Sequence, residues 1–189
     1  MNRLEISKKV FLDRYNESRS VECALRKALN AAVQRNTLYV SGIQTSNRNA
    51  IRSYWGDCLK ELGSEFREDV SLHKYERMIE QLKIRMNREF GHAFLSGCAH
   101  GSMFRVSHAQ KSISVFVKHL WCLGEIPEPN ICPIGRLILK KTPARLSNDL
   151  AWGYVNTIEA HREKFRYVME AAALARLSVA RWELFEFDS

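Results

Sequence analysis

The sequence lacks the long apolar segments and the paired cysteines that mark membrane proteins and disulfide-bonded proteins. No stretch approaches the roughly 18 consecutive apolar residues that a membrane-spanning helix requires, and residues 1–15 contain no unbroken apolar run of the kind found in signal peptides. The five cysteines are an odd number, lie far apart and form no CxxC pair, which is the usage of a reducing compartment. These absences predict a cytoplasmic protein without a membrane segment.

Short motifs for nucleotide binding and hydrolysis are also missing. The chain contains no GxxxxGK[ST] or GxGxxG loop, no GxSxG nucleophile turn and no HExxH zinc motif. Its acidic clusters, at 65–69 and 183–188, lack the strand context in which a two-metal nuclease holds its carboxylates. We therefore expect no cofactor, and the sequence favours a role other than catalysis; if the protein is an enzyme, we expect a nuclease.

Apolar residues with helical spacing are abundant. Hydrophobic residues make up 46% of the chain, enough for a core, and apolar positions recur at i, i+3 and i+4 over much of its length. We predict a mainly α fold, with six or seven helices in a single compact domain over residues 1–189. A possible subdivision separates basic N-terminal helices (1–63) from core helices (64–189).

Local patterns in the second half add two predictions. Pro127, Pro129 and Pro133 exclude a helix through the loop that contains them. After this loop, residues 135–140 are expected to form a short strand that pairs with residues 38–40 in a small two-stranded β element. A long helix is then expected to begin after a cap at residue 147 or 148 and to continue to about residue 172.

Positive charge is concentrated near the N-terminus. The net charge is +8 and the isoelectric point is about 9.4. Residues 1–60 carry eleven Lys/Arg against five Asp/Glu, whereas residues 124–189 carry nine of each. This charge favours a small nucleic-acid-binding or regulatory protein, for DNA or RNA, that contacts phosphates. The many apolar helix faces leave open an assembly subunit with a protein partner, or a homo-oligomer.

The basic residues best suited to phosphate lie on and around one amphipathic helix predicted from Ser107 to about residue 123. Lys111 and Lys118 share one side of that helix with two serines, and the alternative is an ordinary solvated face. A second group, at 45–52, places arginines at a helix N-terminus, where they bind an anion or simply flank a cap. The predicted phosphate-binding residues are Arg48, Arg52, Arg105, Lys111, Lys118, Arg136 and Lys140.

One segment has the spacing of a known nuclease motif. The run Arg85-Met-Asn-Arg-Glu-Phe-Gly-His92 loosely resembles the Arg…His spacing of helical ribonucleases of the HEPN type, although Met86 replaces their usual polar residue. The resemblance implies a metal-independent ribonuclease or toxin in which Arg85 or Arg88 holds a phosphate and His92 moves a proton. His108, which lies close to Arg105 in the sequence, is a second candidate for such an Arg–His pair.

A metal site has little support in the spacing of the ligand-type residues. Cys98 and His100 form the one close pair of zinc-type ligands, and the further close pairs of structural zinc sites are missing. Cys98 and His100 are therefore the candidate ligands, and packing of these side chains is the favoured alternative.

Overall fold

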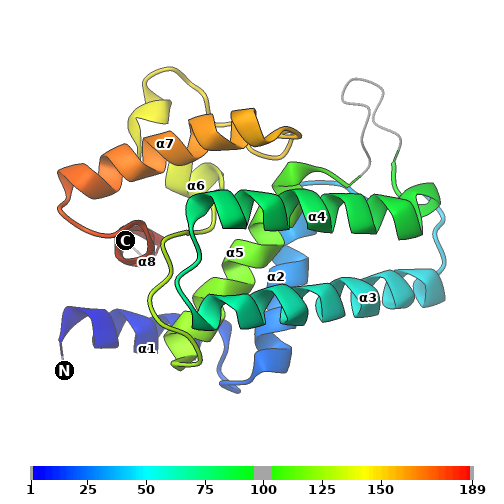
Figure 1. The fold of residues 1–189 in the computed structure, drawn as a ribbon, viewed down its shortest axis with the longest axis horizontal. Helices are drawn as coiled ribbons and strands as arrows, with labels where there is room; N and C mark the ends of the chain where they lie inside the picture. The colour runs from blue at the N-terminus through cyan, green and yellow to red at the C-terminus, as the bar shows by residue number, and fades with distance from the viewer. Residues whose placement is uncertain (1, 96–103, 188–189) are drawn as a thin grey trace.

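The computed structural model describes residues 2–95 and 104–187, and α-helices make up most of this part of the chain (Figure 1). The described helices are α1 (Arg3–Tyr15), α2 (Val21–Val33), α3 (Thr45–Ser64), α4 (Leu72–Phe90), α5 (Val106–Leu123), α6 (Arg136–Leu139), α7 (Ile158–Leu174) and α8 (Val179–Phe187). The prediction of a mainly α fold is confirmed. The described helices outnumber the six or seven expected because α6 is a separate four-residue turn. No helix in the described ranges combines the length and apolar character needed to cross a membrane.

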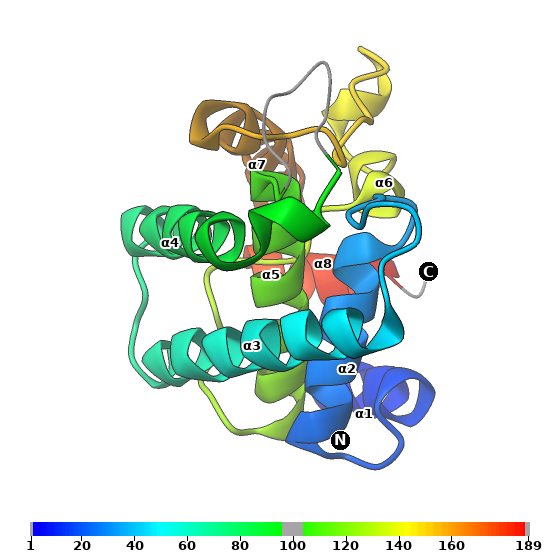
Figure 2. The same ribbon diagram turned by 90° about the vertical axis from the view of Figure 1, so that its right-hand side faces the viewer.

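Helix α5 forms the centre of the molecule. In both views it runs through the middle of the other helices, and it packs against α1, α2, α3, α4 and α7 (Figures 1 and 2). The interpretation of its polar side as an ordinary solvated face is wrong, because Ser107, Ser114 and Lys118 are all buried. This face is covered by parts of the chain that lie far away in sequence, so its polar residues find partners inside the protein.

The most extensive helix pair joins α2 to α5. The contact face of α2 carries Ala24, Ala28 and Ala32, each fully buried. These residues recur every four positions and therefore lie on one side of the helix. Because alanine side chains are short, the backbones of the two helices can approach closely along this face.

The predicted pairing of residues 38–40 with 135–140 is wrong. In the structure Val40 N donates to Ala93 O (3.1 Å) and Leu95 N donates to Leu38 O (2.8 Å), which makes a single antiparallel bridge between Tyr39 and Phe94. Residues 136–139 form α6 instead. Two exposed residues are followed by two buried ones in this segment. This pattern fits a helical turn, whereas exposed and buried residues would alternate in a strand.

The long helix predicted from about residue 148 begins only at Ile158, where the Thr157 side chain accepts a hydrogen bond from Ala160 N. Residues 149–157, here called the strap, are not helical and cross the N-terminal end of α5. Val155 O accepts a hydrogen bond from Ser107 N (2.9 Å). The strap thus satisfies a backbone donor that the first turn of α5 leaves without an intrahelical partner.

Buried apolar side chains form two clusters. The larger surrounds α5 and draws on α1 to α4, while the smaller joins α6, α7 and α8 through residues such as Leu139, Val168 and Trp182. The larger cluster combines residues from both sides of position 63. Between the two clusters, α5, the strap and α6 leave a cavity that contains most of the polar side chains considered below.

Candidate functional site

A cavity of about 1140 Å³ lies among the described helices. It is bounded by α1, α2 and the loop after α2, by α5 and α6, and by the strap and α8. Six basic side chains line it: Lys27, Arg35, Arg105, Lys111, Lys118 and Arg136. Glu183 is the single carboxylate among the lining residues that the structure describes. We call this site the basic cavity.

The basic cavity brings together four of the seven predicted phosphate-binding residues: Arg105, Lys111, Lys118 and Arg136. The other three lie elsewhere. Arg48 and Arg52 flank Tyr39, with the Arg48 guanidinium 5.4 Å from the Tyr39 ring centroid and Arg52 Nη2 donating to Asn30 Oδ1 (2.6 Å). Lys140 is exposed at the end of α6 and does not line the cavity.

Sequence reasoning missed two of the lining cations. Lys27 lies off the apolar stripe of α2, and that position was a visible signal that it faces a polar environment. Arg35 follows α2 with a positive φ of 56°, which turns the chain back toward α5. Neither residue could be assigned to a shared site from the sequence, because the opposite wall of the cavity comes from the strap and α6.

Arg105 is a buried cation held by neutral groups. Its Nε donates to Gly153 O (3.0 Å), its Nη2 donates to Asn36 Oδ1 (2.5 Å), and the guanidinium lies 5.9 Å from the Tyr154 ring centroid. Only 7% of Arg105 is exposed, and no carboxylate of the described residues pairs with it. Burial lowers the pKa of this guanidinium, while the nearby Tyr154 acts in the opposite direction.

Lys111 likewise forms no ion pair with the residues that the structure describes. Its Nζ lies 5.5 Å from the centroid of the Trp152 ring, and no carboxylate in the described part of the chain lies within ion-pairing distance. The ammonium is pressed against Gly135, where an added Cβ would lie 2.9 Å from Nζ. Burial lowers the pKa of Lys111 to about 8; Lys118 contributes in the same direction and Glu183 opposes it.

Lys118, by contrast, is neutralised within the protein. Its Nζ lies 2.7 Å from Glu183 Oε2, and the two side chains are only 6% and 1% exposed. The ammonium also lies between two aromatic rings, 4.5 Å from the centroid of Phe11 and 4.2 Å from that of Phe187. The cavity therefore contains one compensated lysine, Lys118, while its other five cations, which include Arg105 and Lys111, form no ion pair with a carboxylate in the described structure.

His108 is fixed as a neutral ring. Its Nδ1 accepts a hydrogen bond from Arg105 N (3.1 Å), so Nε2 carries the proton and donates to Asn36 O (3.3 Å). Burial, with a smaller contribution from Arg105, lowers the pKa of His108 to about 3. With both ring nitrogens engaged and no exposed surface, this side chain orders the loop after α2 against α5.

The residues of the ribonuclease-like spacing lie apart from the basic cavity. Arg85 Nη1 pairs with Glu61 Oε2 (2.8 Å), an interaction that raises the pKa of Arg85, and Arg88 Nε pairs with Glu89 Oε1 (3.0 Å). His92 is exposed in a short 3-10 turn after α4. Both arginines thus already have carboxylate partners.

The candidate zinc ligands Cys98 and His100 lie outside the described residues. Within the described residues, no group of three or more His, Cys, Asp or Glu side chains is placed to hold a metal ion. The four described cysteines are free and buried. Burial raises the pKa of Cys122 to about 12, so its thiol stays protonated and acts as an apolar packing group.

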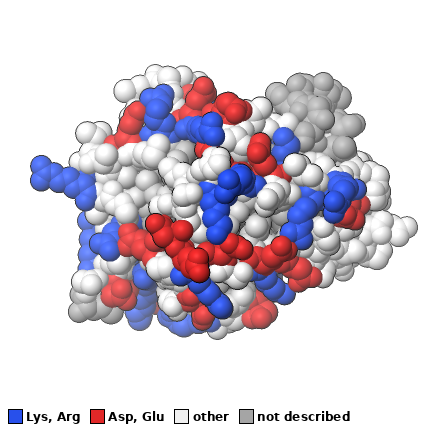
Figure 3. All heavy atoms as spheres, in the orientation of Figure 1, with Lys and Arg blue, Asp and Glu red and all other residues white. Residues whose placement is uncertain are grey.

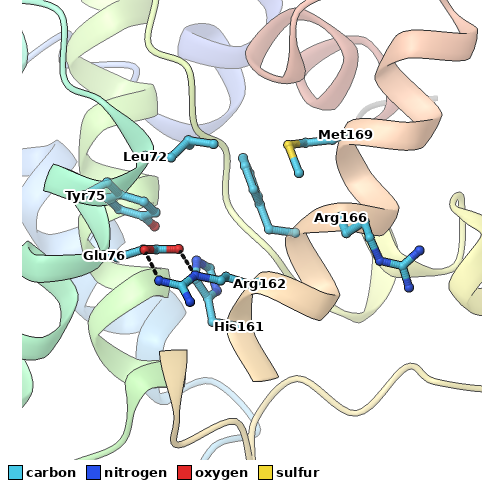
Figure 4. A pocket seen from close by; sticks show the side chains of 8 residues that line it. Leu72, Tyr75, Glu76, His161, Arg162, Arg166 and Met169 are labelled. Carbon is cyan, nitrogen blue, oxygen red and sulfur yellow. Dashed lines mark hydrogen bonds and ion pairs between the residues drawn. The ribbon is translucent and has the colours of Figure 1, made fainter. Parts of the chain in front are cut away.

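A second, smaller cavity of about 350 Å³ lies between α4 and α7 (Figure 4). Its lining is largely apolar, and Arg162 forms a two-point ion pair with Glu76 beside it, at 2.6 and 2.7 Å. His161 lies beneath this pair, and burial lowers its pKa to about 4. The second lining arginine, Arg166, pairs with Glu170 at 2.7 Å, so both arginines of this cavity already have carboxylate partners.

The charge on the face of the molecule that carries α3, α4 and α7 is mixed. Figure 3 shows basic and acidic side chains interspersed there, with no continuous basic patch. In the basic cavity, by contrast, six positive side chains line one hollow. No protein-family model, curated protein or solved structure matches this chain significantly.

Proposed function

We propose that this protein binds nucleic acid by holding a backbone phosphate in the basic cavity against Arg105, Lys111 and Arg136. The observation that supports the proposal is the lack of any carboxylate partner for Arg105 and Lys111 in the described structure. Removing a charge from water without a partner costs several kcal/mol, so a bound anion would offset a cost that the unliganded protein bears.

The other lining residues have subsidiary roles in this proposal. Arg136 is exposed on α6 and offers a mobile donor at the rim, whereas Lys27 and Arg35 provide charge on the opposite wall. Lys118 is already paired with Glu183 and acts as scaffold. The free, buried thiols fit action in the reducing cytoplasm.

A protein interface is the second candidate function. Leu137 on α6 is 65% exposed, and Leu146 nearby in sequence is 91% exposed. Sedimentation of the purified chain tests this reading. A stable oligomer that dissociates when both leucines are replaced by serine supports it, and a monomer at all concentrations weakens it.

The nucleic-acid proposal is tested by fluorescence anisotropy with labelled DNA and RNA oligonucleotides over a range of salt concentrations. Affinity should fall steeply with salt, and Arg136→Ala should reduce the slope of log K against log salt by about 0.7 to 0.9. Lys140→Ala is the matched control, because it removes the same charge from the end of α6 without touching the cavity. Equal binding by the two variants, or no binding at low salt, would refute the proposal.

A further inference from the structure

We infer that the ligand of the basic cavity is an unpaired nucleotide, either free or within a single strand, whose base stacks on Tyr154 while its phosphate meets Lys111 and Arg105. This inference rests on the proposed function and narrows it to a ligand class. It depends on an exposed aromatic ring, on the size of the cavity and on two cations, Arg105 and Lys111, that have no carboxylate partner among the described residues.

Tyr154 is an exposed aromatic side chain at the edge of the cavity. It belongs to the strap, is 66% exposed and lines the same hollow as the six cations. The Arg105 guanidinium lies 5.9 Å from its ring centroid, so part of the ring is supported from inside the protein. An exposed aromatic side chain beside basic side chains is the combination that holds single-stranded nucleic acids.

The position of Tyr154 is set by the strap. Gly153 O accepts hydrogen bonds from both Arg105 Nε (3.0 Å) and Ser107 Oγ (2.8 Å), and Val155 O accepts one from Ser107 N. These bonds flank Tyr154 on both sides in sequence. The backbone on both sides of Tyr154 is therefore anchored before any ligand arrives, which lowers the ordering cost of binding.

The size of the cavity suits a single nucleotide. Its volume of about 1140 Å³ is close to the upper range of small-molecule sites, which is enough for one or two nucleotides. A duplex carries its phosphates on a convex outer surface and keeps its base faces stacked inside. Because its bases are stacked on one another, a duplex could not place the face of a base on Tyr154.

The test compares a labelled single strand with the matched duplex at equal salt, and adds nucleoside monophosphate or ribose 5-phosphate as competitors. We expect at least tenfold tighter binding of the single strand and stronger competition by the compound that has a base. Tyr154→Ala should weaken single-strand binding by about 5- to 150-fold. Tyr154→Phe, which keeps the ring, should bind like the wild type.

The outcomes separate this inference from the function on which it rests. If duplex binds as tightly as single strand, or if Tyr154→Ala leaves affinity unchanged while Arg136→Ala lowers it, the unpaired-nucleotide inference is wrong and phosphate binding stands. If Arg136→Ala behaves like Lys140→Ala, or if no oligonucleotide binds, both fall. Unchanged circular dichroism spectra and melting temperatures of the Tyr154 variants ensure that any loss reflects the ring.

Discussion

The buried ion pair between Lys118 and Glu183 gives a sharp test of how the core around α5 is stabilised. Both side chains are almost completely buried, and their charged atoms lie 2.7 Å apart. We consider Lys118→Met, Glu183→Met and the double variant. Methionine is close in length to either side chain, so the substitutions remove charge while leaving the volume of the core nearly unchanged.

Each single substitution leaves one charge buried without its partner, and we expect it to lower the free energy of unfolding by about 3 to 5 kcal/mol. Glu183→Met should lie at the low end of that range, because the Lys118 ammonium keeps its contacts with the Phe11 and Phe187 rings. In the double variant neither charge remains. We expect it to regain most of the lost stability, so that the coupling energy exceeds about 3 kcal/mol.

Urea unfolding followed by far-ultraviolet circular dichroism at pH 7 measures these values. The dependence of the free energy on urea concentration should be the same for all four proteins, which shows that the folded and unfolded states are comparable. The reasoning is refuted if the double variant is as unstable as the sum of the two single variants. That result would mean that the two charges are solvated separately and not balanced by each other.

Three further predictions concern pH and backbone space. Burial lowers the pKa of His108 and His119 to about 3 and that of His161 to about 4. Below pH 6.5 the unfolded chain therefore binds protons that the folded chain does not, and each histidine should lower the free energy of unfolding by about 1.4 kcal/mol per pH unit. Urea midpoints should fall as the pH is lowered from 6.5 to 5, and constant midpoints would contradict this prediction. Because burial lowers the pKa of Lys111 to about 8, affinity for an oligonucleotide should fall as pH rises through 8. In anisotropy titrations Lys111→Arg should remove this fall in affinity. If the fall remains in the variant, another group is responsible for it. Gly135→Ala places a Cβ 2.9 Å from Lys111 Nζ at an extended backbone position. The substitution should displace the lysine and weaken oligonucleotide binding with little change in melting temperature. Unchanged affinity would show that Lys111 can move without loss of binding.

Helix starts were predictable where a local signal decides them. Serine is a preferred helix-capping residue, and the side chains of Ser20 and Ser71 accept hydrogen bonds from Cys23 N and Lys74 N, both at 3.2 Å. The strap was not predictable in the same way. Its residues have helical spacing, but their carbonyls instead accept hydrogen bonds from α5, which lies far away in the sequence.

The burial of the polar side of α5 was beyond sequence reasoning for a related reason. Apolar periodicity separates polar from apolar faces, but it does not reveal whether a polar face meets water, a cavity or a distant side chain. Glu183, which neutralises Lys118, comes from the last helix, and Asn36, which holds Arg105, comes from the loop after α2. The candidate residues could be named, but their division into paired and unpaired cations required the fold.

That division links ligand binding to folding. Lys118 has its carboxylate in the protein, so its contribution to stability is complete without a ligand. Arg105 and Lys111 have only neutral partners in the described structure, so their charges are fully compensated only when an anion enters. An anion that binds only the folded state adds about 2.7 kcal/mol of stability at a concentration 100 times its Kd. Replacing Lys111 should therefore reduce ligand-induced stabilisation, whereas breaking the Lys118 pair lowers stability whether or not the ligand is present.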